Sequence, residues 1–159
     1  MGETDRIWDM LQRAYAGNAW HGPALSELLQ SVTATQAAAR PIPEAHTIWE
    51  TARHLTALED AVTRRLQGQP VGELPPDQDW PRIEDTSPAA WRRTLEDFEG
   101  GHRRLRRALS GFPDSRLDDV VPGRDYPFYL MLHGVVEHEL YHSGQIVVLM
   151  QAQGLTPRG

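Results

Sequence analysis

The sequence predicts an all-α fold: a four-helix bundle with one long crossover connection and short extra helices. Three observations support this prediction. Apolar residues recur at spacings of three and four along almost the whole chain. Capping residues and Gly or Pro breaks divide the chain into four main helical segments. Residues 69–86 form a connection rich in Pro, Asp and Gly that is long enough to run back along the bundle. No segment predicts a strand, and 159 residues suit a single domain, residues 1–159.

Two helical segments open the chain. The spacing of Ile7, Leu11 and Tyr15 predicts the first, which ends before Gly17. After the Gly22-Pro23 break, a second apolar stripe predicts another helix, and residues 37–39 suit one further turn before Pro41. The second stripe consists of Leu25, Leu28, Leu29 and Val32.

A capping box starts the second main helix, which we expect over about residues 48–67. The Thr47 hydroxyl can accept a hydrogen bond from the third backbone amide of the helix, and Glu50 can reach back to the amide of Thr47. Gly68 ends the helix. The residues expected to face inward are Ile48, Leu55, Leu58, Val62 and Leu66.

The connection over residues 69–86 permits a crossover topology. A helix over residues 48–67 is about 30 Å long, whereas the connection can span about 60 Å when extended. The next helix can therefore start back at the far end of the bundle and run parallel to the previous one.

The third and fourth main helices have clear starting signals. Ser87 is a cap, and Pro88 suits the first helical position. Pro127 opens the last helix, which is expected to run to about Gln153. The buried stripe of the third helix consists of Trp91, Leu95, Phe98, His102, Leu105 and Leu109.

The composition excludes several classes of protein. Sixteen basic and 22 acidic side chains give a net charge of −6, which argues against a nucleic-acid partner. The chain has no Cys, so disulfides, catalytic thiolates and Cys-based metal sites are ruled out. We find neither a signal peptide nor an apolar run long enough to cross a membrane, and expect a cytoplasmic protein without a membrane partner.

The motif most informative about chemistry is the pair His138 and His142 in the last helix. Two residues four positions apart lie about 40° apart around a helix, so both imidazoles can face one ion. Neutral imidazole binds zinc, nickel, copper or iron(II) well. The alternative is a pair of core histidines that bond to the backbone or to each other.

A metal site with two protein ligands is weak, so a third ligand is expected. His54 lies at the edge of the apolar stripe of the second main helix, and His102 lies on the stripe of the third. His133 is about 140° from His138 around the helix and should not face the same ion. His46 precedes the cap of its helix and suits a solvated position or a contact at the helix end.

Four segments of the chain resemble the DinB-like superfamily of metal-binding four-helix bundles. The most specific are residues 46–55, which read HTIWETARHL, and residues 138–146, which read HELYHSGQI. Residues 19–25, AWHGPAL, and Arg40-Pro41 also look like one bacterial branch of this superfamily. The resemblance covers nearly the whole chain, although residues 69–125 contribute little identity.

The resemblance implies a metal site formed by His54, His138 and His142, with room for water or substrate. It also implies the up-down-down-up helix order with the crossover, and a homodimer. Intrinsic affinity favours Zn or Ni in such a site, with Fe or Mn as alternatives.

Two further residues are candidates for catalysis. Glu50 lies one turn before His54 and could act as a base on metal-bound water, although its capping role also explains it. Gln145 is expected on the inward face, where it could bond a bound ligand or orient His142.

Three classes of function remain open: an enzyme, a non-catalytic binding protein and a structural protein. Three neutral histidines leave a divalent ion with its full charge and an open position, which is typical of a catalytic site. Characterised members of the superfamily include transferases and isomerases that use thiols such as bacillithiol or mycothiol, and others are described as metal-dependent hydrolases. We favour a metal-dependent enzyme with a small-molecule substrate, most specifically a thiol-dependent transferase. The alternatives are a hydrolase using a metal-bound water, a non-catalytic metal- or ligand-binding stress protein, and a structural dimer with vestigial histidines.

Overall fold

The computed structural model describes residues 2–157 of the chain, and in this part all regular elements are helical. Four long helices form the bundle, and short helices lie in the connections between them. The long helices are α1 (Glu3–Ala16), α4 (Ile48–Leu66), α6 (Pro88–Ser110) and α7 (Phe128–Ala152); the short ones are α2 (Leu25–Gln30), α3 (Ala34–Ala38), α5 (Pro76–Asp79) and the 3-10 turn at Asp114–Arg116.

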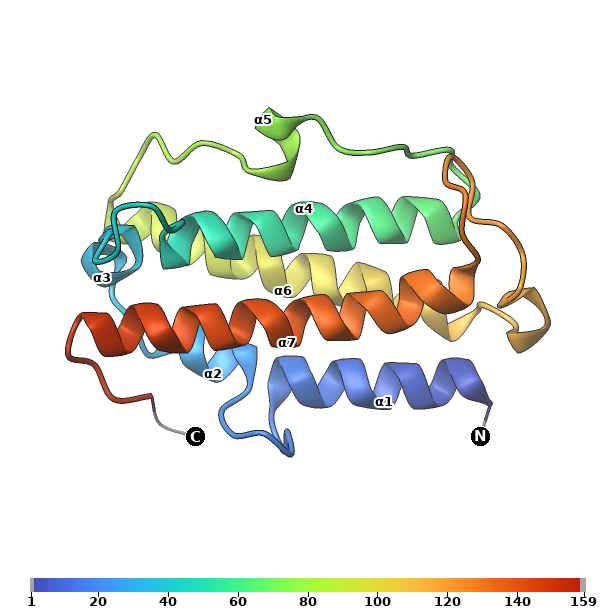
Figure 1. The fold of residues 1–159 in the computed structure, drawn as a ribbon, viewed down its shortest axis with the longest axis horizontal. Coiled ribbons are helices and arrows are strands. Elements are labelled where there is room, and N and C mark those ends of the chain that lie inside the picture. The colour runs from blue at the N-terminus through green and yellow to red at the C-terminus, as the bar shows by residue number, and fades with distance from the viewer. Residues whose placement is uncertain (1, 158–159) are drawn as a thin grey trace.

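The helix order is the predicted crossover bundle. In Figure 1, α4 and α6 run in one direction, whereas α1 and α7 run in the other. The segment between α4 and α6 returns along the length of α4, as the reach of residues 69–86 allows. The prediction of an all-α four-helix bundle with a long crossover is therefore confirmed. The structure adds the single-turn helix α5, which the sequence analysis had treated as part of an irregular connection.

Local signals start the helices where the sequence predicts. The amide of Glu50 donates to the Thr47 hydroxyl at 3.1 Å, and the amide of Thr47 donates to the Glu50 carboxylate at 2.8 Å, which confirms the capping box of α4. The amide of Ala90 donates to the hydroxyl of Ser87, which caps α6 with Pro88 at its first position. These caps fix the residue at which each helix enters the bundle.

The apolar interior is divided into two clusters along the bundle. One contains Leu55 of α4 and Phe98 of α6; the other contains Val62 of α4 and Leu105 of α6. Between these levels the interior-facing positions of α4 and α6 carry polar side chains. One expected core residue, Leu58, is only partly buried, because the adjacent Glu59 takes the interior position at 1% exposure. A polar layer therefore crosses the middle of the core.

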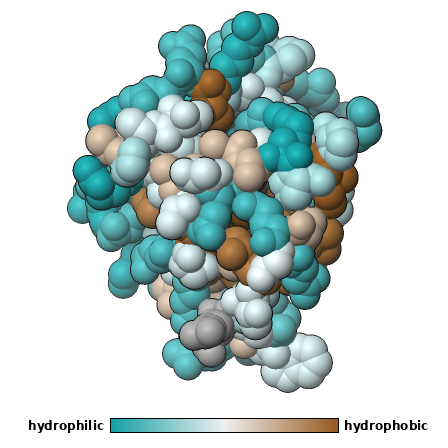
Figure 2. All heavy atoms as spheres, turned by 90° about the vertical axis from the view of Figure 1, so that its left-hand side faces the viewer, coloured by the Kyte–Doolittle hydropathy of each residue, from teal (hydrophilic) through white to brown (hydrophobic). Residues whose placement is uncertain are grey.

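The surface at the end of the bundle near α3 is mostly hydrophilic, with hydrophobic atoms in scattered patches (Figure 2). In the described part of the chain, no helix combines the length and the apolar composition needed to cross a membrane.

Candidate metal centre

Three histidines from two antiparallel helices converge at one point. The Nε2 atom of His138 lies 3.0 Å from Nε2 of His54 and 3.1 Å from Nε2 of His142. α4 supplies His54, and two successive turns of α7 supply the other two. The structure thus brings together the three residues that the sequence analysis proposed as ligands, because the crossover makes α4 and α7 antiparallel neighbours.

The hydrogen bonds of the outer ring nitrogens fix which nitrogen of each ring faces the centre. Nδ1 of His54 lies 2.8 Å from the carbonyl oxygen of Asp79, which can only accept, so this Nδ1 carries the proton. Nδ1 of His142 likewise lies 2.7 Å from Oε1 of Gln145. In the neutral rings, both Nε2 atoms therefore present lone pairs toward Nε2 of His138. A cation at the centre would resolve this crowding of lone pairs.

The environment of His138 and His142 keeps these two rings neutral. Burial, with the neighbouring rings of His142 and His54, lowers the pKa of His138 to about 3. Burial also lowers the pKa of His142, and this effect outweighs the hydrogen bond to Gln145, which favours the protonated ring. At neutral pH these two rings therefore keep the lone pairs that a metal ligand needs.

The crossover segment covers the site and orients His54. The ring of Trp80 is sandwiched between His54 and His46, with ring centroids 4.0 Å and 3.5 Å away and planes nearly parallel. Asp79 places both its carbonyl oxygen and, at 3.1 Å, its carboxylate beside Nδ1 of His54. Neither residue was predicted from the sequence. The sequence offers one signal for them: acidic residues and a Trp follow the Pro75-Pro76 pair. Because this segment has no periodicity, the signal does not predict which way their side chains point.

An apolar cavity of about 490 Å³ adjoins the site. Gln145, which touches His142, and His46, which stacks on Trp80, both line it. Gln145 is itself exposed, so it lies at the rim of the site rather than on the buried face expected from the sequence. Its position suits the second of its two expected roles, orienting His142.

Replacement of Gln145 by Leu is expected to lower zinc affinity about 10- to 100-fold, because His142 loses the partner that fixes its tautomer and orientation. Competition with a chromophoric chelator measures this affinity. Gln151→Leu is the matched control, since Gln151 is an exposed residue on the same helix. Equal affinities in the two variants would contradict an orienting role for Gln145.

Glu50, the predicted catalytic base, is occupied by other contacts. Its carboxylate accepts from Arg40 at 2.7 Å and 2.9 Å and from the amide of Thr47. Partial burial raises the pKa of Glu50, but the Thr47 amide and Arg40 outweigh it, and the net shift is downward. A lowered pKa makes a carboxylate a weaker base.

The other histidines considered as third ligands lie elsewhere. His46 is half exposed and stacks on Trp80. His133 faces Glu3 at 3.2 Å. His102 is buried beside Glu59, with Nδ1 3.1 Å from Oε1 of Glu59. The convergent set therefore contains none of these three.

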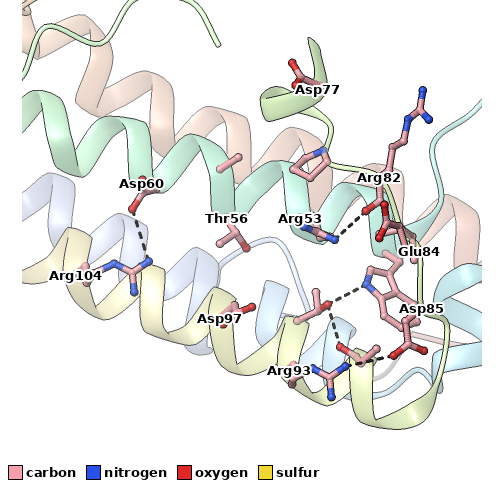
Figure 3. Close-up of a pocket in the computed structure, with 16 residues that line it drawn as sticks. Arg53, Thr56, Asp60, Asp77, Arg82, Glu84, Asp85, Arg93, Asp97 and Arg104 are labelled. Atoms are coloured by element: carbon pink, nitrogen blue, oxygen red, sulfur yellow. Dashed lines mark hydrogen bonds and ion pairs between the residues drawn. The ribbon is translucent and has the colours of Figure 1, made fainter. Parts of the chain in front are cut away.

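A larger cavity, of about 780 Å³, lies between α4, α6 and the crossover, and contains no histidine (Figure 3). Charged side chains of both signs line it, and several pair with each other, such as Arg93 with Asp85 and Arg104 with Asp60. Arg53 donates to the carbonyl oxygen of Arg82 and so ties the crossover to α4. This bond and those of His54 hold the crossover over the histidine site.

The three histidines fit a divalent transition metal. In a tetrahedral site with metal–nitrogen bonds of about 2.05 Å, ligand nitrogens lie about 3.3 Å apart, close to the spacings observed here. All three donors are imidazoles, which suits Zn, Ni or Fe(II) better than Mg or Ca. The arrangement fits a metal-binding protein, with partners already in place for the outer nitrogens of His54 and His142.

No curated protein and no protein of solved structure shows a significant match to the chain. The family model described as the DinB superfamily matches residues 19–146. This span contains all three histidines and extends from just after α1 into α7. The chain therefore belongs to the DinB superfamily.

Proposed function

We propose that the protein is a divalent-metal-dependent enzyme that acts on a small molecule, with a low-molecular-weight thiol of the bacillithiol or mycothiol type as co-substrate. The convergence of three imidazole Nε2 atoms beside a cavity is the observation that supports this proposal most directly. The metal would be Zn or Ni by intrinsic affinity, with Fe or Mn as alternatives.

Different residues of the chain bind the ion, orient its ligands and cover the site. His54, His138 and His142 hold the ion without neutralising its charge. Such an ion would act as a Lewis acid and would lower the pKa of a thiol or a water molecule beside it. Gln145 orients His142, and Trp80 covers one face of His54 and limits the access of water. The adjoining cavity, largely apolar in its lining, accommodates the substrate.

One observation, the engagement of the Glu50 carboxylate by other groups, favours a thiol over water as the nucleophile. The chain has no Cys, so any thiolate must come from a second substrate. A hydrolase needs a base for its water, but the carboxylate of Glu50 is held by Arg40 and Thr47 and its pKa is lowered. A thiol needs little help from a base, because its ordinary pKa is only about 8.5 and a nearby cation lowers it further.

The test is an activity screen of the metal-loaded protein with and without thiol. Zinc- or nickel-loaded protein is expected to consume bacillithiol or mycothiol in the presence of small electrophiles, and the His54→Ala variant is expected to lose this activity. Hydrolysis of esters or amides without any thiol would overturn the thiol proposal in favour of a hydrolase. A metal-loaded protein without either activity would overturn the enzyme proposal and leave a binding protein.

A further inference from the structure

A second cluster of potential metal ligands lies inside the bundle. Glu59 of α4, His102 of α6 and Glu139 of α7 offer ligand atoms that all lie within 4.8 Å of one another. Their exposed fractions are 1%, 4% and 1%. They form the polar layer that separates the two apolar clusters of the core, and they share no residue with the three-histidine site.

The polar atoms of this cluster lack partners. Both carboxylate oxygens of Glu139, Oε2 of Glu59 and Nε2 of His102 are buried without a hydrogen bond among the described residues. Nδ1 of His102 lies 3.1 Å from Oε1 of Glu59, which links these two members of the cluster. Buried polar atoms are rarely left unpaired, since each costs free energy of folding.

Within residues 2–157, no arginine forms an ion pair with either carboxylate, and Glu59 pairs with His102. Arg65, the buried arginine, donates to the carbonyl oxygens of Val71 and Gly72 instead.

The surroundings fix the cluster in place and exclude solvent. The ring of Tyr15 stacks on His102, with centroids 3.8 Å apart, and Trp8 lies 5.2 Å from the same ring. α1 therefore covers the side of the cluster that the other three helices leave open. Gly101 of α6 lies beside the cluster, since a Cβ atom there would be 3.4 Å from Oε2 of Glu59.

We propose that Glu59, His102 and Glu139 form a second divalent-cation site, buried in the core and distinct from the three-histidine site. Two carboxylates neutralise the charge of such a cation, which lets it remain in an apolar interior. The mixed oxygen and nitrogen donors suit Mn²⁺, Fe²⁺ or Zn²⁺ rather than a soft metal. The cation joins α4, α6 and α7 at the level where the apolar core is interrupted.

The second site is tested in the whole chain after the three-histidine site has been removed by substitution. In the His54→Ala/His142→Ala background, protein refolded with Zn²⁺ or Mn²⁺ and passed through a desalting column should retain about one equivalent of metal by elemental analysis. Adding Glu59→Gln and Glu139→Gln to this variant should abolish the retention of metal. Glu99→Gln is the matched control, because Glu99 is an exposed residue of α6 that pairs with Arg103, and it should retain the metal.

A measurement on the unaltered protein avoids any dependence on the folding of the variants. Anomalous diffraction from crystals of the metal-loaded protein should show a peak between Glu59, His102 and Glu139 as well as one at the three histidines. Absence of the first peak, or metal retention unaffected by the two Gln substitutions, would overturn the proposal. Either result would leave the three-histidine site and its proposed function untouched.

Discussion

The His142→Ala variant is expected to lose its metal at the three-histidine site. Removing the ring takes away one of three ligand nitrogens, and Gln145 then has no ring to orient. Loss of an outer partner alone costs about 10- to 100-fold in affinity, so loss of a ligand should cost more than about 100-fold. Competition with a chromophoric chelator, together with elemental analysis after desalting, measures the loss.

A second histidine on the same helix provides the control. His133 lies on α7, is partly exposed and contacts Glu3, so His133→Ala removes an equivalent side chain outside the site. Its zinc affinity should match that of the unaltered protein. Equal metal retention by the His142→Ala and His133→Ala variants would show that His142 is not a ligand. Circular dichroism of both metal-free variants confirms that each remains helical.

The bundle could be predicted because its signals are local. A capping box, a Ser-Pro start and apolar spacings of three and four each act within one or two turns of helix, and the structure confirms them at Thr47 and Ser87. The length of residues 69–86 permitted the crossover, and the family resemblance implied it. The His138 and His142 pair could be recognised for the same reason, since helix geometry places both rings on one face.

The contacts of the crossover segment with the site could not be predicted, because they depend on where this irregular segment packs. Trp80 and Asp79 lie 26 and 25 positions beyond His54 in a segment without periodicity, and only the packed structure shows that they contact its ring. Arg53, tied to the carbonyl oxygen of Arg82, helps to hold this segment. Such contacts depend on tertiary packing.

The buried Glu59 and Glu139 had a signal that the sequence analysis did not use. Glu59 falls between Leu55 and Val62 at helical spacing, and Glu139 falls between Val135 and His142 on the interior face of α7. Carboxylates on an apolar stripe are rare without a partner. Hydrophobicity alone favoured Leu58 for the interior position that Glu59 occupies.

The Trp49→Ala variant is expected to show the largest loss of stability. Trp49 is 1% exposed, packs against Trp91 with ring centroids 5.0 Å apart, and donates from Nε1 to the Thr94 hydroxyl at 2.9 Å. Truncation leaves a cavity between α4 and α6 and removes the donor to Thr94. The free energy of unfolding should fall by about 3–5 kcal/mol, which corresponds to a decrease in Tm of roughly 6–20 °C in a chain of this size.

Thermal and urea unfolding of the metal-free proteins, followed by circular dichroism, measure this loss, and Trp20→Ala is the matched control. Trp20 is 100% exposed, so its removal should change the unfolding free energy by no more than about 0.5 kcal/mol. Equal stability of the two variants would contradict the packing of α4 on α6. A metal that binds only the folded chain should raise the Tm of both variants, by an amount that grows with the logarithm of its affinity. Because Trp49 lies on the same helix as His54, that increase also reports whether the altered α4 still presents its histidine to the other two.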